Sequence, residues 1–220
     1  MIKEYQKRIL SSFFLFPISF FFIIKGSFFF NFFLIIFFLI SSYEWYMMSN
    51  KKNYHLFGYL FLFASFISAY LLRNLETQIS GLFIFLFVTI ICISSDIGGY
   101  IFGKIFKGPK LTKISPKKTY SGIIGGYFLS LISIYFFIIF YQKNYYQNIL
   151  YSIKLILIVL IITLTSQIGD ILISYFKRLS NVKDTGKIIP GHGGLLDRID
   201  GMIFAFPVAY ILFFINTYLI

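Results

Sequence analysis

Seven long apolar runs divide this chain, and they constrain its fold more than any other feature. A transmembrane α-helix needs about 20 mostly apolar residues, and runs of roughly that length recur from one end of the sequence to the other. They cover residues 9–24, 27–42, 56–73, 81–102, 121–141, 150–176 and 201–219. Only 13% of the residues are charged, against about 25% in soluble domains, which excludes a water-soluble fold. We therefore predict an all-α polytopic membrane protein with about seven transmembrane helices.

These runs leave little room for a second domain. We expect one integral membrane domain over 1–220, with apolar amino-terminal helices over 1–80 and the function-bearing helices and cytosolic loops over 81–220. The basic amino terminus precedes an apolar run, as in a signal peptide, but no small-residue cleavage site follows, so we expect this run to be kept as a helix. Only Lys25 and Gly26 separate it from the next run, which predicts a tight helical hairpin.

Positive charge predicts how the helices are oriented. The chain has 20 Lys and Arg residues against 8 Asp and Glu residues, and cytosolic loops of membrane proteins carry the excess of Lys and Arg. With the amino terminus in the cytosol, 16 of the 20 basic residues fall on the cytosolic side: Lys3, Lys7, Arg8, Lys51, Lys52, Lys104, Lys107, Lys110, Lys113, Lys117, Lys118, Lys177, Arg178, Lys183, Lys187 and Arg198. An odd number of spans then places the carboxyl terminus outside. This distribution explains the charge without a nucleic-acid partner.

The aspartates have a more specific distribution. All five lie at the cytosolic ends of the fourth and sixth runs or in the segment around the start of the seventh: Asp96, Asp170, Asp184, Asp197 and Asp200. Charges at membrane depth are costly and usually face a polar cavity or a functional site. The positive-inside distribution gives no reason for acids to gather there, so we expect these carboxylates to hold something cationic.

The end of the sixth run combines an acid with two cations. Its polar residues are spaced i, i+4, i+7 and i+8, so that they share one face of a helix: Asp170, Ser174, Lys177 and Arg178. This spacing would put a carboxylate inside the membrane and two cations at the mouth of the site. Because arginine is a bidentate donor suited to phosphate, the pattern favours a phosphate-bearing ligand.

The segment that follows has a glycine-rich turn and two more acids. Residues 190–194 read P-G-H-G-G, and such glycines permit close backbone approach to a ligand, where successive N–H groups can bind an anion. Asp197 and Asp200 come next, three apart and on one helical face. Mg²⁺ prefers one or two carboxylates and completes its shell with water and phosphate oxygens. We therefore predict that Asp170 and Asp197 hold Mg²⁺, with Asp200 as a further partner.

Together these residues resemble the signature of a known family. S-x-x-K-R, K-D, P-G-H-G-G and D-R-x-D follow one another over residues 174–200, and this series is similar to that of the phosphatidate cytidylyltransferase (CDP-diacylglycerol synthase) family. Residues 115–126, S-P-K-K-T-Y-S-G-I-I-G-G, resemble a second family segment, except that Ser121 stands where the family usually has glutamate. Weaker similarity is found at Asp96 and at Glu44-Trp45.

The resemblance implies an enzyme that transfers a cytidylyl group from CTP to phosphatidate, giving CDP-diacylglycerol and pyrophosphate in phospholipid biosynthesis. It further implies Mg²⁺ as cofactor, a homodimer, and a location in the inner (cytoplasmic) membrane with the active site at the cytosolic face. Whether a monovalent cation assists is left open. The chain is short for the family, so we expect an amino-terminal helix of the family to be missing.

Individual residues can be given roles on this basis. Asp170, Asp197 and Lys118 are the expected catalytic residues. The expected binding residues for nucleotide, triphosphate and lipid phosphate are Asp96, Lys117, Lys118, Thr119, Ser174, Lys177, Arg178, Lys183, Asp184, His192, Gly193 and Arg198. The attacking phosphate is already anionic, so His192 is expected to donate a hydrogen bond or shape the glycine turn rather than act as a base. Purely structural roles are expected for His55, Cys92, Gly99 and Gly103.

Two other functions fit parts of the pattern. A CTP-dependent lipid or polyprenol kinase would have a similar membrane architecture, but it would release CDP instead of pyrophosphate. A small transporter would also place charges inside a helical bundle, although transporters usually have paired repeats and broken helices near the membrane midplane. No repeat is found here and the charges cluster at one membrane face, which favours the cytidylyltransferase.

Overall fold

The computed structural model describes residues 2–75, 80–112, 115, 118–141, 153–191 and 193–218. These ranges contain seven α-helices and no extended β-strand. The helices are α1 (Ile2–Lys25), α2 (Ser27–Ser49), α3 (His55–Arg73), α4 (Gly81–Phe106), α5 (Tyr120–Tyr141), α6 (Ile153–Leu179) and α7 (Leu196–Tyr218). Each covers one of the seven apolar runs, so the all-α prediction is confirmed.

The outer surfaces of the helices are apolar, as expected of helices that contact lipid. Five helices, α2 to α6, are long and apolar enough to cross a membrane. Large apolar side chains point outward from the bundle: Phe28 is 74% exposed and Phe140 is 88% exposed. Aromatic surface of this extent is unfavourable in water. The chain is therefore a multi-pass membrane protein, whereas the full count of seven crossings stays a prediction.

Most helices extend beyond the apolar runs. The helix α2 continues to Ser49 and α6 to Leu179, while α7 already begins at Leu196. Hydropathy marks only the part of a helix that lies in lipid, whereas backbone hydrogen bonding continues until a cap ends it. In α4, for example, that cap is Lys107, whose backbone is left-handed with φ 44°.

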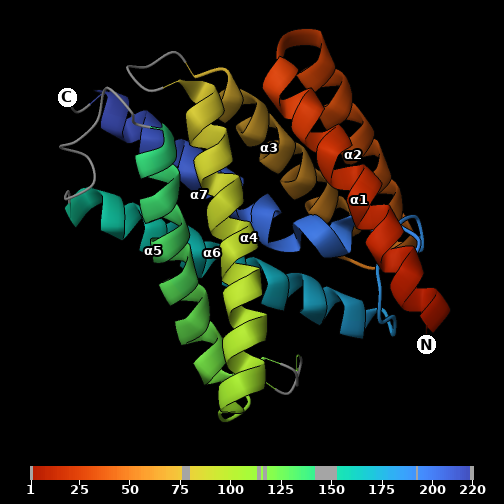
Figure 1. Ribbon diagram of the computed structural model, residues 1–220. Helices are drawn as coiled ribbons and strands as arrows, with labels where there is room; N and C mark the ends of the chain where they lie inside the picture. The colour runs from red at the N-terminus through yellow and green to blue at the C-terminus, as the bar shows by residue number, and fades with distance from the viewer. Residues whose placement is uncertain are drawn as a thin grey trace.

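The first two helices form the tight hairpin that the sequence predicts (Figure 1). Gly26, the residue between them, has φ 66°, a conformation that glycine adopts without steric cost. The Arg73 side chain at the end of α3 donates through Nε and Nη2 to the carbonyl of Ile23, with both distances 3.3 Å. This contact fixes the hairpin to the rest of the bundle.

A short turn joins α2 to α3, and His55 is the first residue of α3 after this turn. The Nδ1 atom of His55 lies 2.7 Å from Ser49 Oγ, and its carbonyl accepts a hydrogen bond from Trp45 Nε1 at 3.0 Å. Its ring also packs on Tyr46 and Tyr59. The structural role expected for His55 agrees with these contacts.

The helices α4 and α5 run side by side because glycines let their backbones touch (Figure 1). A Cβ added at Gly98 would overlap the backbone of Gly125, and one added at Gly122 would lie 2.8 Å from the carbonyl oxygen of Gly99. Such small-residue contacts are typical of helix packing in membranes. The packing role expected for Gly99 is therefore confirmed.

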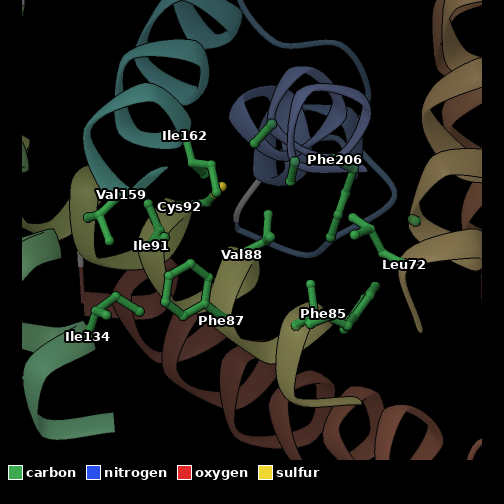
Figure 2. Packing of buried hydrophobic residues seen from close by; sticks show 14 of the residues in the cluster. Leu72, Phe85, Phe87, Val88, Ile91, Cys92, Ile134, Val159, Ile162 and Phe206 are labelled. Atoms are coloured by element: carbon green, nitrogen blue, oxygen red, sulfur yellow. The ribbon is translucent and has the colours of Figure 1, made fainter. Parts of the chain in front are cut away.

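The helix α4 lies at the centre of the main hydrophobic core. Figure 2 shows side chains of this helix, among them Val88 and Ile91, surrounded by Leu72 of α3, Ile162 of α6 and residues of α5 and α7. Cys92 is 1% exposed within this core, as expected of a structural thiol. The core holds α4 rigidly against the helices that carry the other functional residues.

Candidate active site

The helices α4 to α7 and the loop before α5 enclose a polar cavity of about 440 Å³. Eight charged side chains line it, and they come from segments up to about a hundred residues apart in the sequence: Asp96, Lys118, Asp170, Lys177, Asp184, Asp197, Arg198 and Asp200. All eight were predicted as site residues. The structure therefore brings all five aspartates to one cavity, while their roles stay predictions.

One side of the cavity is organised around Asp170 on α6. Its Oδ2 atom lies 2.5 Å from Nζ of Lys118, which also approaches the carbonyl of Gln167 at 3.4 Å. Ser174, one turn further along α6, donates to Oδ1 of Asp170 at 3.4 Å. Both oxygens of Asp170 thus have a partner that the sequence pattern had placed in the site.

The opposite side is organised around Asp197 in the first turn of α7. Lys177 Nζ lies 2.7 Å from its Oδ1 atom. Its Oδ2 atom accepts from the backbone N–H groups of Thr185 at 2.8 Å and Gly194 at 3.1 Å. Asp197 therefore orients a lysine and also closes the loop between α6 and α7.

Asp96 and Asp200 are two further carboxyl groups of the same cavity. Asp96 on α4 and Asp200 on α7 are each close enough to Asp170 for their carboxylates to repel one another. Lys118 and Arg198 attract Asp96, and Lys177 attracts Asp200. Carboxylates crowded in this way are stabilised by any added cation.

The loop between α6 and α7 brings a glycine turn to the cavity. Gly193 has φ 88°, and the N–H of Ile189 donates to its carbonyl at 3.0 Å. A Cβ at Gly193 would lie 3.2 Å from Oδ2 of Asp197 and 3.4 Å from Cβ of Asp184. The predicted glycine turn is present, and it packs directly on two of the cavity's aspartates.

The loop before α5 contributes Thr119 as well as Lys118. Thr119 lines the cavity, and its Oγ1 atom accepts from the N–H of Gly122 at 3.1 Å, which caps the start of α5. Ser121, in the position where glutamate is usual, lies 3.0 Å from Thr119 Oγ1 and accepts from the N–H of Gly108 at 3.3 Å. A serine at this position thus helps to close the loop.

Other predicted site residues lie elsewhere. Arg178 is exposed, donates to the carbonyl of Val182 in the loop after α6 at 3.3 Å, and does not line the cavity. Lys183 is also exposed and does not line the cavity. Lys117 and His192 lie outside the described residues. Gly99, for which only packing was expected, also lines the cavity.

Comparison with known proteins agrees with this geometry. A family model described as the cytidylyltransferase family matches residues 50–216. This range is more than half of the chain and contains every charged residue of the cavity. The chain belongs to the cytidylyltransferase family.

Relatives named phosphatidate cytidylyltransferase are similar over most of the chain. The protein of Rickettsia bellii (strain RML369-C) is 41% identical over 228 residues, which cover 98% of this chain and 94% of that protein. The protein of Rickettsia conorii (strain ATCC VR-613 / Malish 7) is 37% identical over 233 residues, with 100% and 96% covered. The protein of Staphylococcus aureus (strain COL) is 44% identical over 138 residues, 62% of this chain and 51% of that protein. The family resemblance read from the motifs is confirmed.

Two polar residues of this cytidylyltransferase-family chain were given no role at the level of sequence. Gln167 lines the cavity and donates through Nε2 to Ser95 Oγ at 3.2 Å and to the carbonyl of Ile123 at 3.3 Å. Glu44 on α2 is 1% exposed and lies beneath the loop between α6 and α7. The available signal for Gln167 was a polar side chain inside an apolar run, and for Glu44 it was the weak family similarity at Glu44-Trp45.

The carboxylates do not form a metal cage in this structure. Among the described residues, no three Asp, Glu, His or Cys side chains are arranged to hold a metal ion. Lysines pair with Asp170 and Asp197 instead. These ion pairs do not exclude a bound cation, because Asp96 and Asp200 remain close to Asp170 and repel its carboxylate.

Proposed function

We propose that this protein is an enzyme that transfers the cytidylyl group of CTP to phosphatidate, giving CDP-diacylglycerol and pyrophosphate for phospholipid biosynthesis. The observation that carries the proposal is the cavity, in which a membrane protein of the cytidylyltransferase family gathers five aspartates with two lysines and an arginine. A volume of about 440 Å³ is within the usual range of small-molecule sites. The names of the relatives support the same reaction.

The chemistry depends on positioning and charge neutralisation more than on covalent help from the protein. A phosphate oxygen of phosphatidate would attack the α-phosphorus of CTP, while the bond from this phosphorus to the oxygen that bridges to the β-phosphate breaks and pyrophosphate leaves. The attacking phosphate is anionic near neutral pH, so no general base is needed. Lys118, Lys177 and Arg198 would offset the negative charge of the phosphates.

The donor set of the cavity fits a divalent cation, because its carboxylates repel one another and come from both α6 and α7. Asp170 and Asp197 would hold Mg²⁺, with Asp200 beside them. When bound, Mg²⁺ would supply further neutralisation of the triphosphate charge. Asp170 and Asp197 would then release Lys118 and Lys177, which become available to phosphate oxygens.

An apolar hollow next to the cavity suits the lipid substrate. About 310 Å³ in volume, it is lined by Tyr127 of α5 and by Leu160, Ile161 and Leu164 of α6. Tyr127 lies about one helical turn beyond Ile123, which lines the polar cavity on the same helix. We infer that an acyl chain of phosphatidate lies in this hollow while its phosphate reaches the lysines.

The orientation follows from charge. Placing the cavity at the cytosolic face of the inner (cytoplasmic) membrane puts Lys118 of the loop before α5, Lys177 near the end of α6 and Arg198 near the start of α7 on the side where CTP occurs. Seven crossings would then leave the carboxyl terminus outside. A homodimer stays a prediction from the family resemblance, and so does any role for a monovalent cation.

Product analysis tests this function. The purified protein, reconstituted with phosphatidate, is supplied with CTP labelled at the α- or the γ-phosphate, with and without Mg²⁺. We expect the α-label in the lipid product, the γ-label in pyrophosphate, and no turnover without Mg²⁺. Transfer of the γ-label to lipid with release of CDP would identify a kinase instead. Absence of both products, with solute uptake into the vesicles, would favour the transporter.

A further inference from the structure

Glu44 is a buried acid that no part of the proposed reaction uses. It lies on α2, is 1% exposed, and does not line the polar cavity. It also precedes residue 50, where the match to the cytidylyltransferase family begins. A buried carboxylate is costly unless hydrogen bonds satisfy it, so its partners should reveal its role.

Glu44 accepts its hydrogen bonds from one short stretch of the chain, residues 185 to 196. Its Oε2 atom accepts from Thr185 Oγ1 at 3.0 Å and from the N–H of Leu196 at 2.8 Å. Its Oε1 atom accepts from the N–H of Leu195 at 2.9 Å. Leu195 and Leu196 lie at the start of α7, where unpaired N–H groups favour a negative charge.

The same stretch is bonded to Asp197 in an alternating pattern. Thr185 gives its side chain to Glu44 and its N–H to Asp197. Gly194 gives its N–H to Asp197, and the next residue, Leu195, gives its N–H to Glu44. The loop is therefore held between two carboxylates, one from outside the cavity and one that lines it.

Two glycines make this contact sterically possible. A Cβ at Gly186 would lie 2.6 Å from Glu44 Oε1, and a Cβ at Gly194 would lie 2.6 Å from Oε2. Both values are well below an ordinary van der Waals contact. Only glycine at these two positions leaves room for the carboxylate of Glu44 against the loop.

We propose that Glu44 is a positioning residue for the reaction: it fixes Thr185 in the loop before α7 and Leu195 and Leu196 at the start of this helix, and through them the orientation of Asp197 and its partner Lys177. The inference rests on the proposed function. Without Glu44, the N–H groups of Thr185 and Gly194 lose their fixed place, and Asp197 no longer has a single orientation toward Lys177.

The sharpest test is Glu44→Gln, which keeps the size and removes one acceptor oxygen. Wherever the amide nitrogen lies, it faces a backbone N–H of Leu195 or Leu196, so one donor is left without an acceptor. We expect kcat to fall about ten-fold or more and the Mg²⁺ concentration for half-maximal activity to rise. Backbone amides over 185–196 should exchange hydrogen faster.

Ser49→Ala is the matched control, because Ser49 is buried on the same helix but bonds to Trp45 and His55 instead of the loop. It should lower thermal stability in detergent without changing kcat or the exchange of 185–196. If Glu44→Gln retains full kcat, or if Ser49→Ala loses as much activity at equal stability, the positioning role is refuted.

Thr185→Val provides a second variant in case Glu44→Gln does not fold. It removes one donor to Glu44 and leaves the N–H bond to Asp197, so kcat should fall less than in Glu44→Gln. The double variant should match Glu44→Gln within about two-fold, because residues in one network are not additive. If the fall in kcat of the double variant equals the product of the falls in the two single variants, the proposal is wrong. An inactive wild-type protein would instead contradict the proposed function, while faster exchange in Glu44→Gln would still report on the loop.

Discussion

Each of the two cavity lysines is held by its own carboxylate. Lys118 pairs with Asp170 and Lys177 with Asp197, so much of the local charge is balanced before any substrate enters. Partly buried pairs of this kind tolerate the loss of neither partner well. A phosphate ligand that carries a divalent cation would satisfy all four side chains at once, because its phosphates would pair with the lysines and its cation with the aspartates. Such a ligand would bind better than the phosphate or the cation alone.

Asp170→Asn and Asp197→Asn should test the carboxylates at this scale. Both changes keep the shape but remove the charge that would hold Mg²⁺, so we expect the Mg²⁺-dependent rate to fall about 100-fold or more. Labelled CTP turnover in reconstituted protein measures the effect. Asn50→Ala, an exposed change outside the cavity, serves as control. Wild-type rates in both aspartate variants would remove them from the metal site.

Residue identities could be predicted from the sequence, but their pairing could not. Acids at the ends of apolar runs have few explanations, which is why the five aspartates could be assigned to one site. The partner of Asp170, by contrast, is Lys118, from a loop 52 positions away in the chain. Nor did the spacing of Arg178 reveal that its side chain lies outside the cavity and donates to the carbonyl of Val182 in the loop after α6. Such choices depend on tertiary geometry that a linear pattern does not contain.

At the scale of elements, α5 and α6 define how a lipid could reach the cavity. Along α6 the lining residues change from polar to apolar, from Asp170 and Gln167 at the cavity to Leu164 and Ile161 at the hollow. A phosphatidate molecule has the same order of polarity, from its phosphate to its acyl chains.

Leu164→Trp should fill the hollow and discriminate between acyl chains. We expect turnover of long-chain phosphatidate to fall about ten-fold, while a short-chain analogue is used nearly as in the wild type. Leu60→Trp, an equally large change at a residue of α3 that is 60% exposed, is the control and should affect neither substrate. Equal losses for both chain lengths in Leu164→Trp would argue against the acyl-chain role of the hollow.

Helices could be located from hydropathy alone, because lipid imposes one secondary structure on any apolar run of this length. Their ends were less accurate, as the extension of α2 to Ser49 illustrates. Ends are decided by individual caps, such as the left-handed Lys107 after α4, and caps leave little trace in an average over many residues. A structural role was predicted for Gly99 of α4, and this glycine does pack closely on α5; the glycines of α5 that α4 contacts were noted only as part of a motif.

At the scale of the whole molecule, orientation is the main property that charge predicts. Cysteine labelling tests it, with Cys92→Ser as the background. Asn50→Cys, in the exposed turn after α2, should react with an impermeant reagent only from the cytosolic side. Asn74→Cys, after α3, should react only from the outside, because one helix separates the two positions. The reverse pattern would invert the predicted topology.

The contact between Glu44 and the loop before α7 also has a consequence for biosynthesis. The acid emerges from the ribosome among the first fifty residues, whereas the N–H groups that it binds belong to residues 195 and 196. A nascent chain therefore lacks a finished centre until almost all of its helices have been synthesised and inserted. Chains whose translation stops before residue 195 would therefore insert into the membrane but would have no activity.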